Sequence, residues 1–185
     1  FDHANRGKAI VTASDYERVR RMAESIHTHS DAVAGLLVGG QREVTFRWRD
    51  EETGVRCKAR VDNYEPGEFM LDLKKTRDAS FEAFARSITS YRYDQQAAHY
   101  TTGARICDRP VPRYIILACE DVPPYVCQPY FLDPMAEERG FNLRRRAIRK
   151  QAQCLNTGIW PGYSTRFEQI SLPTFAYFGI QEPTR

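Results

Sequence analysis

Two adjoining segments alternate between apolar and polar residues, and this pattern constrains the fold more than any other feature. Apolar residues occupy every second position of residues 43–49 and 55–62, namely Val44, Phe46, Trp48, Val55, Cys57, Ala59 and Val61. Side chains of a β-strand point alternately to opposite faces, so each segment is expected to bury one face and expose the other. Residues 50–54 end in Thr-Gly and supply a turn, so the two segments predict a β-hairpin.

A third strand is predicted after a turn at residues 63–67, and it carries two chemically reactive side chains. Asp72 and Lys74 are expected on one face, because residues two apart along a strand point the same way. The apolar residues of this strand, Phe69, Leu71 and Leu73, are expected to face the core. Asp62 ends the preceding strand, so its carboxylate is expected near that of Asp72.

The remaining segments predict helices and two further strands. A helix at residues 14–28 begins with a capping box of Ser14 and Glu17, and a shorter one at about 30–38 ends at Gly39-Gly40. Residues 79–103 read as helix, bent near 90–91 and ended by Gly103; residues 112–119 and 125–132 read as strands, and 134–155 as a helix. This order predicts one α/β (α+β) domain over residues 1–185, with a central mixed sheet flanked by helices.

Composition excludes several classes of protein. The five cysteines are widely spaced and form no Cys-x-x-Cys pair, which argues against a zinc ribbon or a redox dithiol. No apolar stretch approaches the ~18–20 residues of a membrane-spanning helix, so no membrane partner is expected. The cysteine usage favours a reducing cytoplasmic location.

A dense basic run lies within the last predicted helix, and its spacing alone does not reveal its purpose. The run comprises Arg144, Arg145, Arg146, Arg149 and Lys150. Such a cluster could follow a phosphate backbone, or it could form a solvated helix face. Both interpretations stay open at this point.

The residue types at the predicted strand ends suit hydrolysis of a phosphodiester bond. Magnesium is held in proteins by one or two carboxylates together with waters and phosphate oxygens. Asp62 and Asp72 could supply the carboxylates, and the peptide carbonyl of Leu73 could add an oxygen ligand. The ammonium of Lys74 could orient or help deprotonate the attacking water and stabilise negative charge.

Each of these residues also has an ordinary structural interpretation. An Asp-x-Lys on a strand is usually a solvent-facing ion pair, and an Asp at a strand end is often a turn residue. Gln96 and Tyr100 are one helical turn apart and could be half-exposed neighbours. The joint order nevertheless favours a site: Glu43, then a strand with Arg56, Lys58 and Arg60 beside Asp62, then Asp72 and Lys74, then Gln96 and Tyr100.

This combination resembles the RecE branch of the PD-(D/E)xK nuclease superfamily, the nuclease domain of exodeoxyribonuclease VIII. The resemblance covers nearly the whole chain. It includes segments outside the predicted site, namely Ile10-Val-Thr-Ala, Cys154-Leu-Asn-Thr157, Trp160-Pro161 and Ser171-Leu-Pro173. The resemblance implies a restriction-endonuclease-like fold.

The resemblance also implies a role for each residue of the predicted site. Asp62 and Asp72 would bind Mg²⁺, for which Mn²⁺ could substitute, and Lys74 would be the catalytic lysine. Glu43 would assist in the metal or water shell. Gln96 and Tyr100 would support the site or hold the DNA backbone, as would Lys58 and Arg60 on the basic strand.

By the same resemblance, the protein would digest linear double-stranded DNA from a 5′ end in phage- or prophage-type recombination. It would act as a homo-oligomeric ring beside a single-strand annealing protein. Val61 stands where the family usually has Pro, Lys75 where it often has Thr, and the chain begins after the family's N-terminal helical segment. The alternatives are an endonuclease, an exonuclease of opposite polarity, and a catalytically impaired DNA-binding relative or scaffold.

Overall fold

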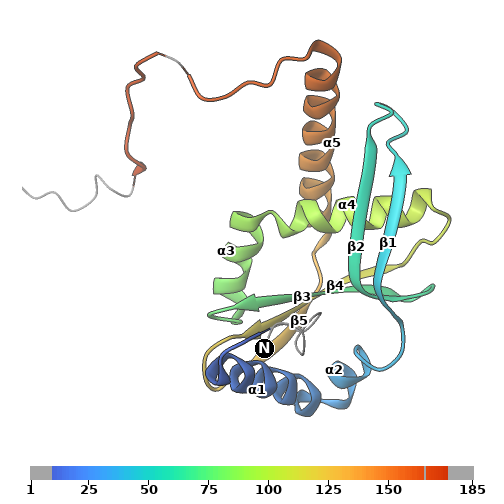
Figure 1. The fold of residues 1–185 in the computed structure, drawn as a ribbon, viewed down its shortest axis with the longest axis vertical. Helices are drawn as coiled ribbons and strands as arrows, with labels where there is room; N and C mark the ends of the chain where they lie inside the picture. The colour runs from blue at the N-terminus through green and yellow to red at the C-terminus, as the bar shows by residue number, and fades with distance from the viewer. Residues whose placement is uncertain (1–9, 165, 175–185) are drawn as a thin grey trace, which may run out of the picture.

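A five-stranded mixed sheet forms the centre of the computed structural model, which describes residues 10–164 and 166–174 (Figure 1). The predicted domain also takes in residues 1–9, 165 and 175–185, which lie outside the described residues. The elements are α1 (Ala13–His29), α2 (Asp31–Gly35), β1 (Gln41–Arg49), β2 (Arg56–Glu65), β3 (Phe69–Thr76), α3 (Phe81–Tyr91), α4 (Tyr93–Ile106), β4 (Arg113–Glu120), β5 (Cys127–Tyr130) and α5 (Pro134–Thr157). The strands lie in chain order; β3 and β4 pair in parallel and all other neighbours are antiparallel. This architecture confirms the predicted α+β fold.

Apolar clusters cover both faces of the inner strands. On one face Met70 packs with residues of α3 and α4, such as Phe84 and Ala97. On the other face Leu71 packs with Ile26 of α1 and Val33 of α2. Because β3 is buried on both faces, simple alternation does not describe it: Asp72 is only 3% exposed, whereas Leu73 is 43% exposed. The prediction that Leu73 faces the core was therefore wrong.

The β1–β2 hairpin is much longer than the stretch over which β2 pairs with β3. We call the place where β2 and β3 separate, at Asp62 and Asp72, the fork. The two hairpin strands pair along their length, from Gln41 opposite Tyr64 to Arg49 opposite Arg56. β2 pairs with β3 only over Asn63–Glu65. The preceding part of β2, residues 56–62, lies away from β3 and rises with β1 beside α4 and α5 (Figure 1). β2 thus runs three residues past its predicted end at Asp62, and these three residues join it to the sheet.

Several predicted boundaries moved for identifiable reasons. Thr12, rather than Ser14, caps α1, because its side chain accepts a hydrogen bond from the Asp15 N–H. The predicted bend after α3 is confirmed, with Arg92 in the left-handed conformation. Gly103 does not end α4, which continues to Ile106. Gly103 instead lies against the Trp48 ring, where an added Cβ would overlap the indole.

The predicted basic run of α5 forms ion pairs with the turn of the hairpin. Arg144, only 2% exposed, and Arg145 both contact Asp50, at 3.1 and 2.7 Å. Arg145 and Arg149 also pair with Glu52 in the same turn. These three arginines have acidic partners more than ninety residues earlier in the chain, and only the fold brings them together. Arg146 and Lys150 of the run are exposed.

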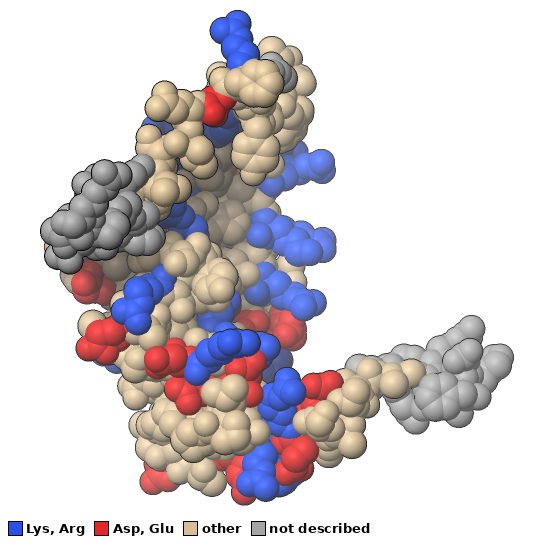
Figure 2. Space-filling view, turned by 90° about the vertical axis from the view of Figure 1, so that its left-hand side faces the viewer, with Lys and Arg blue, Asp and Glu red and all other residues tan. Residues whose placement is uncertain are grey.

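The outer face of the hairpin is basic as well, and there the charges point into solvent. Its two strands present Arg47, Arg49, Arg56, Lys58 and Arg60 on the side away from α4. Figure 2 shows Lys and Arg side chains projecting in a column along the right-hand edge of the molecule. No helix among the described residues is long and apolar enough to cross a membrane.

Candidate active site

The fork between β2 and β3 brings together Asp62 and the Asp72–Lys74 segment. The β2–β3 ladder ends at Asn63 opposite Leu71, so its next position would pair Asp62 with Asp72. Instead of continuing the ladder, the carboxylate of Asp62 accepts a hydrogen bond from the Leu73 N–H at 2.8 Å. The Asp62 side chain therefore takes the place of a strand neighbour, and this contact fixes it beside β3.

Asp72 is the most deeply buried acidic group of the fork. Its Oδ1 accepts a 2.7 Å hydrogen bond from Nε2 of Gln96 on α4. Its Oδ2 forms an ion pair with the ammonium of Lys74. Burial raises the pKa of Asp72, and the nearby charge of Asp62 adds to this effect, while Lys74 and Gln96 oppose it. Burial thus makes ionisation of this carboxyl less favourable than in water.

The Lys74 ammonium lies between a carboxylate and an aromatic ring. It contacts Asp72 on one side and stands 4.8 Å from the ring centroid of Tyr93 on the other. A cation over the face of a tyrosine ring is attracted by the ring's quadrupole. Tyr93 was not predicted as a site residue, although it lies three residues before Gln96 and therefore on the same side of α4.

Two further tyrosines form the wall of the site. Burial raises the pKa of Tyr100, and the side chain of Gln96 opposes this shift through a hydrogen bond. Tyr114 of β4 meets the Tyr100 ring edge to face, with 6.1 Å between centroids. Burial, and then the charge of Asp72, raise the pKa of Tyr114 well above its usual value. Tyr114 was missed by the sequence analysis, because only the parallel register shows that Ile116, two residues later, lies opposite Asp72.

The oxygen atoms at the fork fit a magnesium ion. Two carboxylates are available: that of Asp62 beside the Leu73 N–H, and the buried one of Asp72. Since the N–H and C=O of a strand residue point to the same neighbour, the Leu73 carbonyl faces the fork together with its N–H. No group of three or more His, Cys, Asp and Glu side chains gathers among the described residues. Waters and phosphate oxygens would therefore complete the shell, as is usual for Mg²⁺.

The other predicted site residues lie apart from this pair of carboxylates. Glu43 occupies the β1 position opposite Asp62, with a left-handed backbone (φ 54°), but its carboxylate forms a 2.7 Å ion pair with Arg60. Lys58 and Arg60 are exposed on the outer face of the hairpin. The backbone carbonyl of Lys58 lies 3.3 Å from Nε2 of His99, so α4 supports the edge of β2 that β3 has left.

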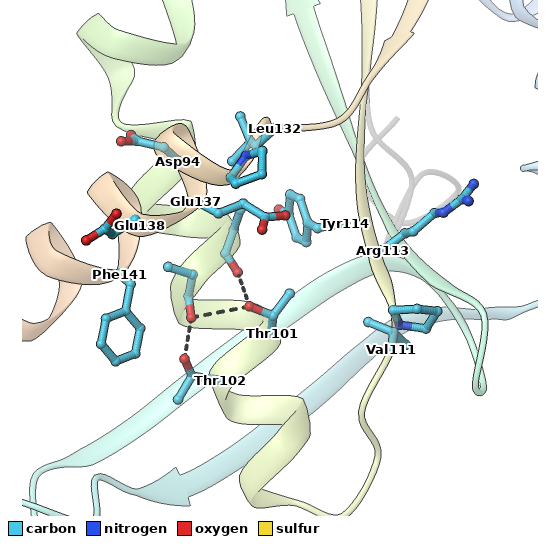
Figure 3. Close-up of a pocket in the computed structure, with 14 residues that line it drawn as sticks. Asp94, Thr101, Thr102, Val111, Arg113, Tyr114, Leu132, Glu137, Glu138 and Phe141 are labelled. Carbon is cyan, nitrogen blue, oxygen red and sulfur yellow. Dashed lines mark hydrogen bonds between the residues drawn. The ribbon is translucent and has the colours of Figure 1, made fainter.

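A cavity near the candidate site is not lined by Asp62, Asp72 or Lys74 (Figure 3). It has a volume of about 460 Å³ and lies between α4, the start of β4 and the start of α5. Thr101 and Thr102 line it, but their hydroxyl groups donate to backbone carbonyls of α4. Tyr114 lines the cavity and also approaches Asp72, so this residue separates the cavity from the carboxylates.

The chain was compared with protein-family models and with solved structures. Residues 2–173 match the family described as "PDDEXK-like domain of unknown function (DUF3799)". The structure is similar to that of a putative exonuclease from Eubacterium rectale, with 14% sequence identity and a TM-score of 0.69 over 97% of this chain and 71% of that chain. At that identity the likeness shows a shared fold alone.

A weaker likeness is to the structure of SSO0001, with 15% identity and a TM-score of 0.40 over 89% of this chain and 92% of that chain. That likeness is too distant to carry any argument. No curated protein matches the chain closely enough to count as a relative. From the match over residues 2–173, the chain belongs to the DUF3799 family of PDDEXK-like domains, and so to the PD-(D/E)xK superfamily.

Proposed function

We propose that this protein is a magnesium-dependent DNA nuclease that hydrolyses phosphodiester bonds at the fork. The observation that carries the proposal is the buried carboxylate of Asp72, which is held by Lys74 and Gln96 and lies beside Asp62 at the point where β2 and β3 separate. Asp62, Asp72 and the Leu73 carbonyl would hold Mg²⁺, and Mn²⁺ would substitute. When bound there, the ion would neutralise charge on the scissile phosphate and make the attacking water more acidic.

The side chains at the fork divide the remaining work. Lys74, held between Asp72 and the Tyr93 ring, presents an ammonium that can orient the attacking water and stabilise charge on the phosphate. Gln96 donates to Asp72 and so fixes the direction of its second oxygen. Each of these contacts positions a reacting group before the substrate arrives, which is where much of the rate enhancement of an enzyme originates.

We further propose that the substrate is linear double-stranded DNA and that digestion proceeds from a 5′ end, as in the RecE branch. The motif resemblance, the PDDEXK-like family and a fold shared with a putative exonuclease support this choice. A role in phage-type recombination, beside a single-strand annealing protein, follows from the same resemblance. A homo-oligomeric ring would keep the enzyme on its substrate; a monomeric mass in solution at several salt concentrations would contradict that part.

Digestion of linear duplex DNA labelled separately at its 5′ and 3′ ends tests the proposal. We expect early release of the 5′ label with Mg²⁺ and none with a chelator. Early release of the 3′ label would contradict the polarity but keep the nuclease. Internal cutting of circular DNA would instead indicate an endonuclease of the same fold.

One observation favours a second candidate, a catalytically impaired relative that binds DNA or acts as a scaffold. Glu43 is paired with Arg60, so among the residues that the structure describes the fork brings together two acidic side chains, those of Asp62 and Asp72. DNA binding without cleavage by the wild-type protein, in both Mg²⁺ and Mn²⁺, would favour this candidate over the nuclease.

A further inference from the structure

Four cations form two directly opposed pairs on the outer face of the β1–β2 hairpin. The register places Arg47 opposite Lys58 and Arg49 opposite Arg56, and all four residues are exposed. We call these four residues the basic ladder. Like charges directly opposite each other in an antiparallel pair destabilise a sheet. Folding alone therefore gives no reason for this arrangement.

The basic ladder lacks acidic partners, unlike the other arginine clusters of the molecule. The side chains of Arg47, Arg56 and Lys58 form no hydrogen bond or ion pair with any described residue, and that of Arg49 meets only the Gly54 carbonyl, at 3.3 Å. The exposed arginines of α1, by comparison, pair with Asp15, Glu17 and Glu24. The ladder thus presents uncompensated positive charge.

The ladder leads directly to the candidate active site. Arg56, Lys58 and Arg60 lie on one face of β2 at intervals of about 6.6 Å, and Asp62 of the fork is the next residue in this series. A shallow hollow lined by all four ladder residues runs between the two strands. All four side chains are exposed, so this surface is open to solvent.

We propose that the basic ladder binds the sugar-phosphate backbone of duplex DNA and guides it to the fork. Duplex DNA carries one negative charge per ~1.7 Å of its axis, and cations that neutralise phosphates gain free energy by releasing counterions. Arginine side chains add bidentate hydrogen bonds to phosphate oxygens. The inference rests on the proposed nuclease function, and it assigns to Arg47, Arg49 and Arg56 a role that neither the family match nor the site geometry provides.

Binding of a fluorescent duplex, followed by anisotropy in chelator over a series of salt concentrations, tests this role without cleavage. For Arg47→Gln/Lys58→Gln we expect binding at least about tenfold weaker at ~0.1 M salt. Two lost phosphate contacts at ~0.9 each should reduce the slope of log K against log salt by about 1.8. The charge-preserving variant Arg47→Lys/Lys58→Arg should bind like the wild type.

A matched control removes the same net charge from another surface. Arg146 and Lys150 are exposed on α5, one helical turn apart, and form no ion pair among the described residues. Arg146→Gln/Lys150→Gln should change the affinity by less than about twofold. An equal loss in both double variants would overturn the proposal, because net charge alone would explain it. An unchanged affinity and salt slope in the ladder variant would overturn it as well.

The nuclease function and the DNA-binding role of the ladder can be contradicted separately. Ladder-dependent DNA binding by a wild-type protein that never cleaves would contradict the nuclease function and leave the role of the ladder standing. Normal cleavage, with binding that does not depend on the ladder, would contradict the ladder alone. A change of oligomeric mass in the ladder variant, without weaker DNA binding, would show that the ladder contacts a second copy of the chain, and would also overturn the proposal.

Discussion

Two basic regions of this molecule look alike in the sequence and differ completely in the fold. Arg144, Arg145 and Arg149 of α5 pair with Asp50 and Glu52, and Arg144 is buried against Asp50. The basic ladder, on the opposite face of the hairpin that carries those two acids, has no acidic partner among the described residues. The number of charges in a segment therefore predicts less than the position of their partners, and the first region serves structure while the second is available to a ligand.

The largest expected effect comes from removing the buried ion pair between Arg144 and Asp50. Arg144→Met removes the buried partner of Asp50 and leaves a buried carboxylate with less compensation. We expect the free energy of unfolding to fall by about 3 kcal/mol, measured by urea denaturation. Arg146→Met on the exposed side of α5 is the control and should change stability by less than about 0.5 kcal/mol. Equal effects of the two variants would contradict the distinction.

A somewhat smaller effect is expected where the inner face of the hairpin rests on α4. Gly103→Ala would push a methyl group into the Trp48 ring. Overpacking of this kind costs about 1–3 kcal/mol, and a thermal melt would show it. Gly35→Ala is the matched control, since an added Cβ at Gly35 meets no atom within 4 Å. A melting temperature of Gly103→Ala equal to that of the wild type would contradict the inference that close packing of Trp48 on α4 stabilises the protein.

Acid should weaken the ion pairs that Asp50 forms with Arg144 and Arg145. Burial tends to raise the pKa of Asp50, but hydrogen bonds from Thr53 and the charges of Arg145 and Arg144 outweigh it, so the pKa is lowered. A carboxyl with a lowered folded-state pKa stabilises the protein above its ordinary value of 3.8 and loses that contribution as the pH falls toward the folded-state pKa. The stability difference between wild type and Asp50→Asn should therefore shrink below about pH 4. A constant difference down to pH 3 would contradict the lowered pKa.

The smallest expected effect is a gain of stability in the basic ladder. Arg56→Glu turns the like-charge pair with Arg49 into an ion pair. We expect stability to rise by about 0.5 kcal/mol, while duplex binding weakens. Chemical denaturation and the anisotropy titration together separate the two effects. A fall in stability would show that Arg56 has a structural role like that of Arg144.

The hairpin and the order of the elements were predictable because their signals are local. Alternation in β1 and β2 works well, since one face of the hairpin is solvated and the other packs on α4. The same rule failed at Leu73, because β3 is covered on both faces and its exposure depends on helices far away in the chain. The ion pairs of the α5 arginines could not be predicted either, because their partners Asp50 and Glu52 are distant in the sequence.

In the candidate site, too, some features could be predicted from local sequence and others depend on tertiary contacts. The structure brings Asp62, Asp72 and Lys74 together, while their roles in catalysis stay a prediction. The fork itself, which depends on the β2–β3 ladder ending at Asn63, has no local sequence signal. Tyr93 and Tyr114 were missed for a related reason, since both acquire their position from tertiary packing on the Asp72 side of the sheet.

The most direct test of the account compares nucleotide release from linear duplex DNA by the wild type and by Asp72→Asn in Mg²⁺, with duplex binding of both measured in chelator. We expect the wild type to digest the DNA and Asp72→Asn to release no nucleotides above background. Duplex binding should agree within about twofold, because the ladder rather than Asp72 would hold the backbone. Digestion by Asp72→Asn at the wild-type rate, or no digestion by the wild type, would contradict the central claim that the fork is a metal-dependent nuclease site.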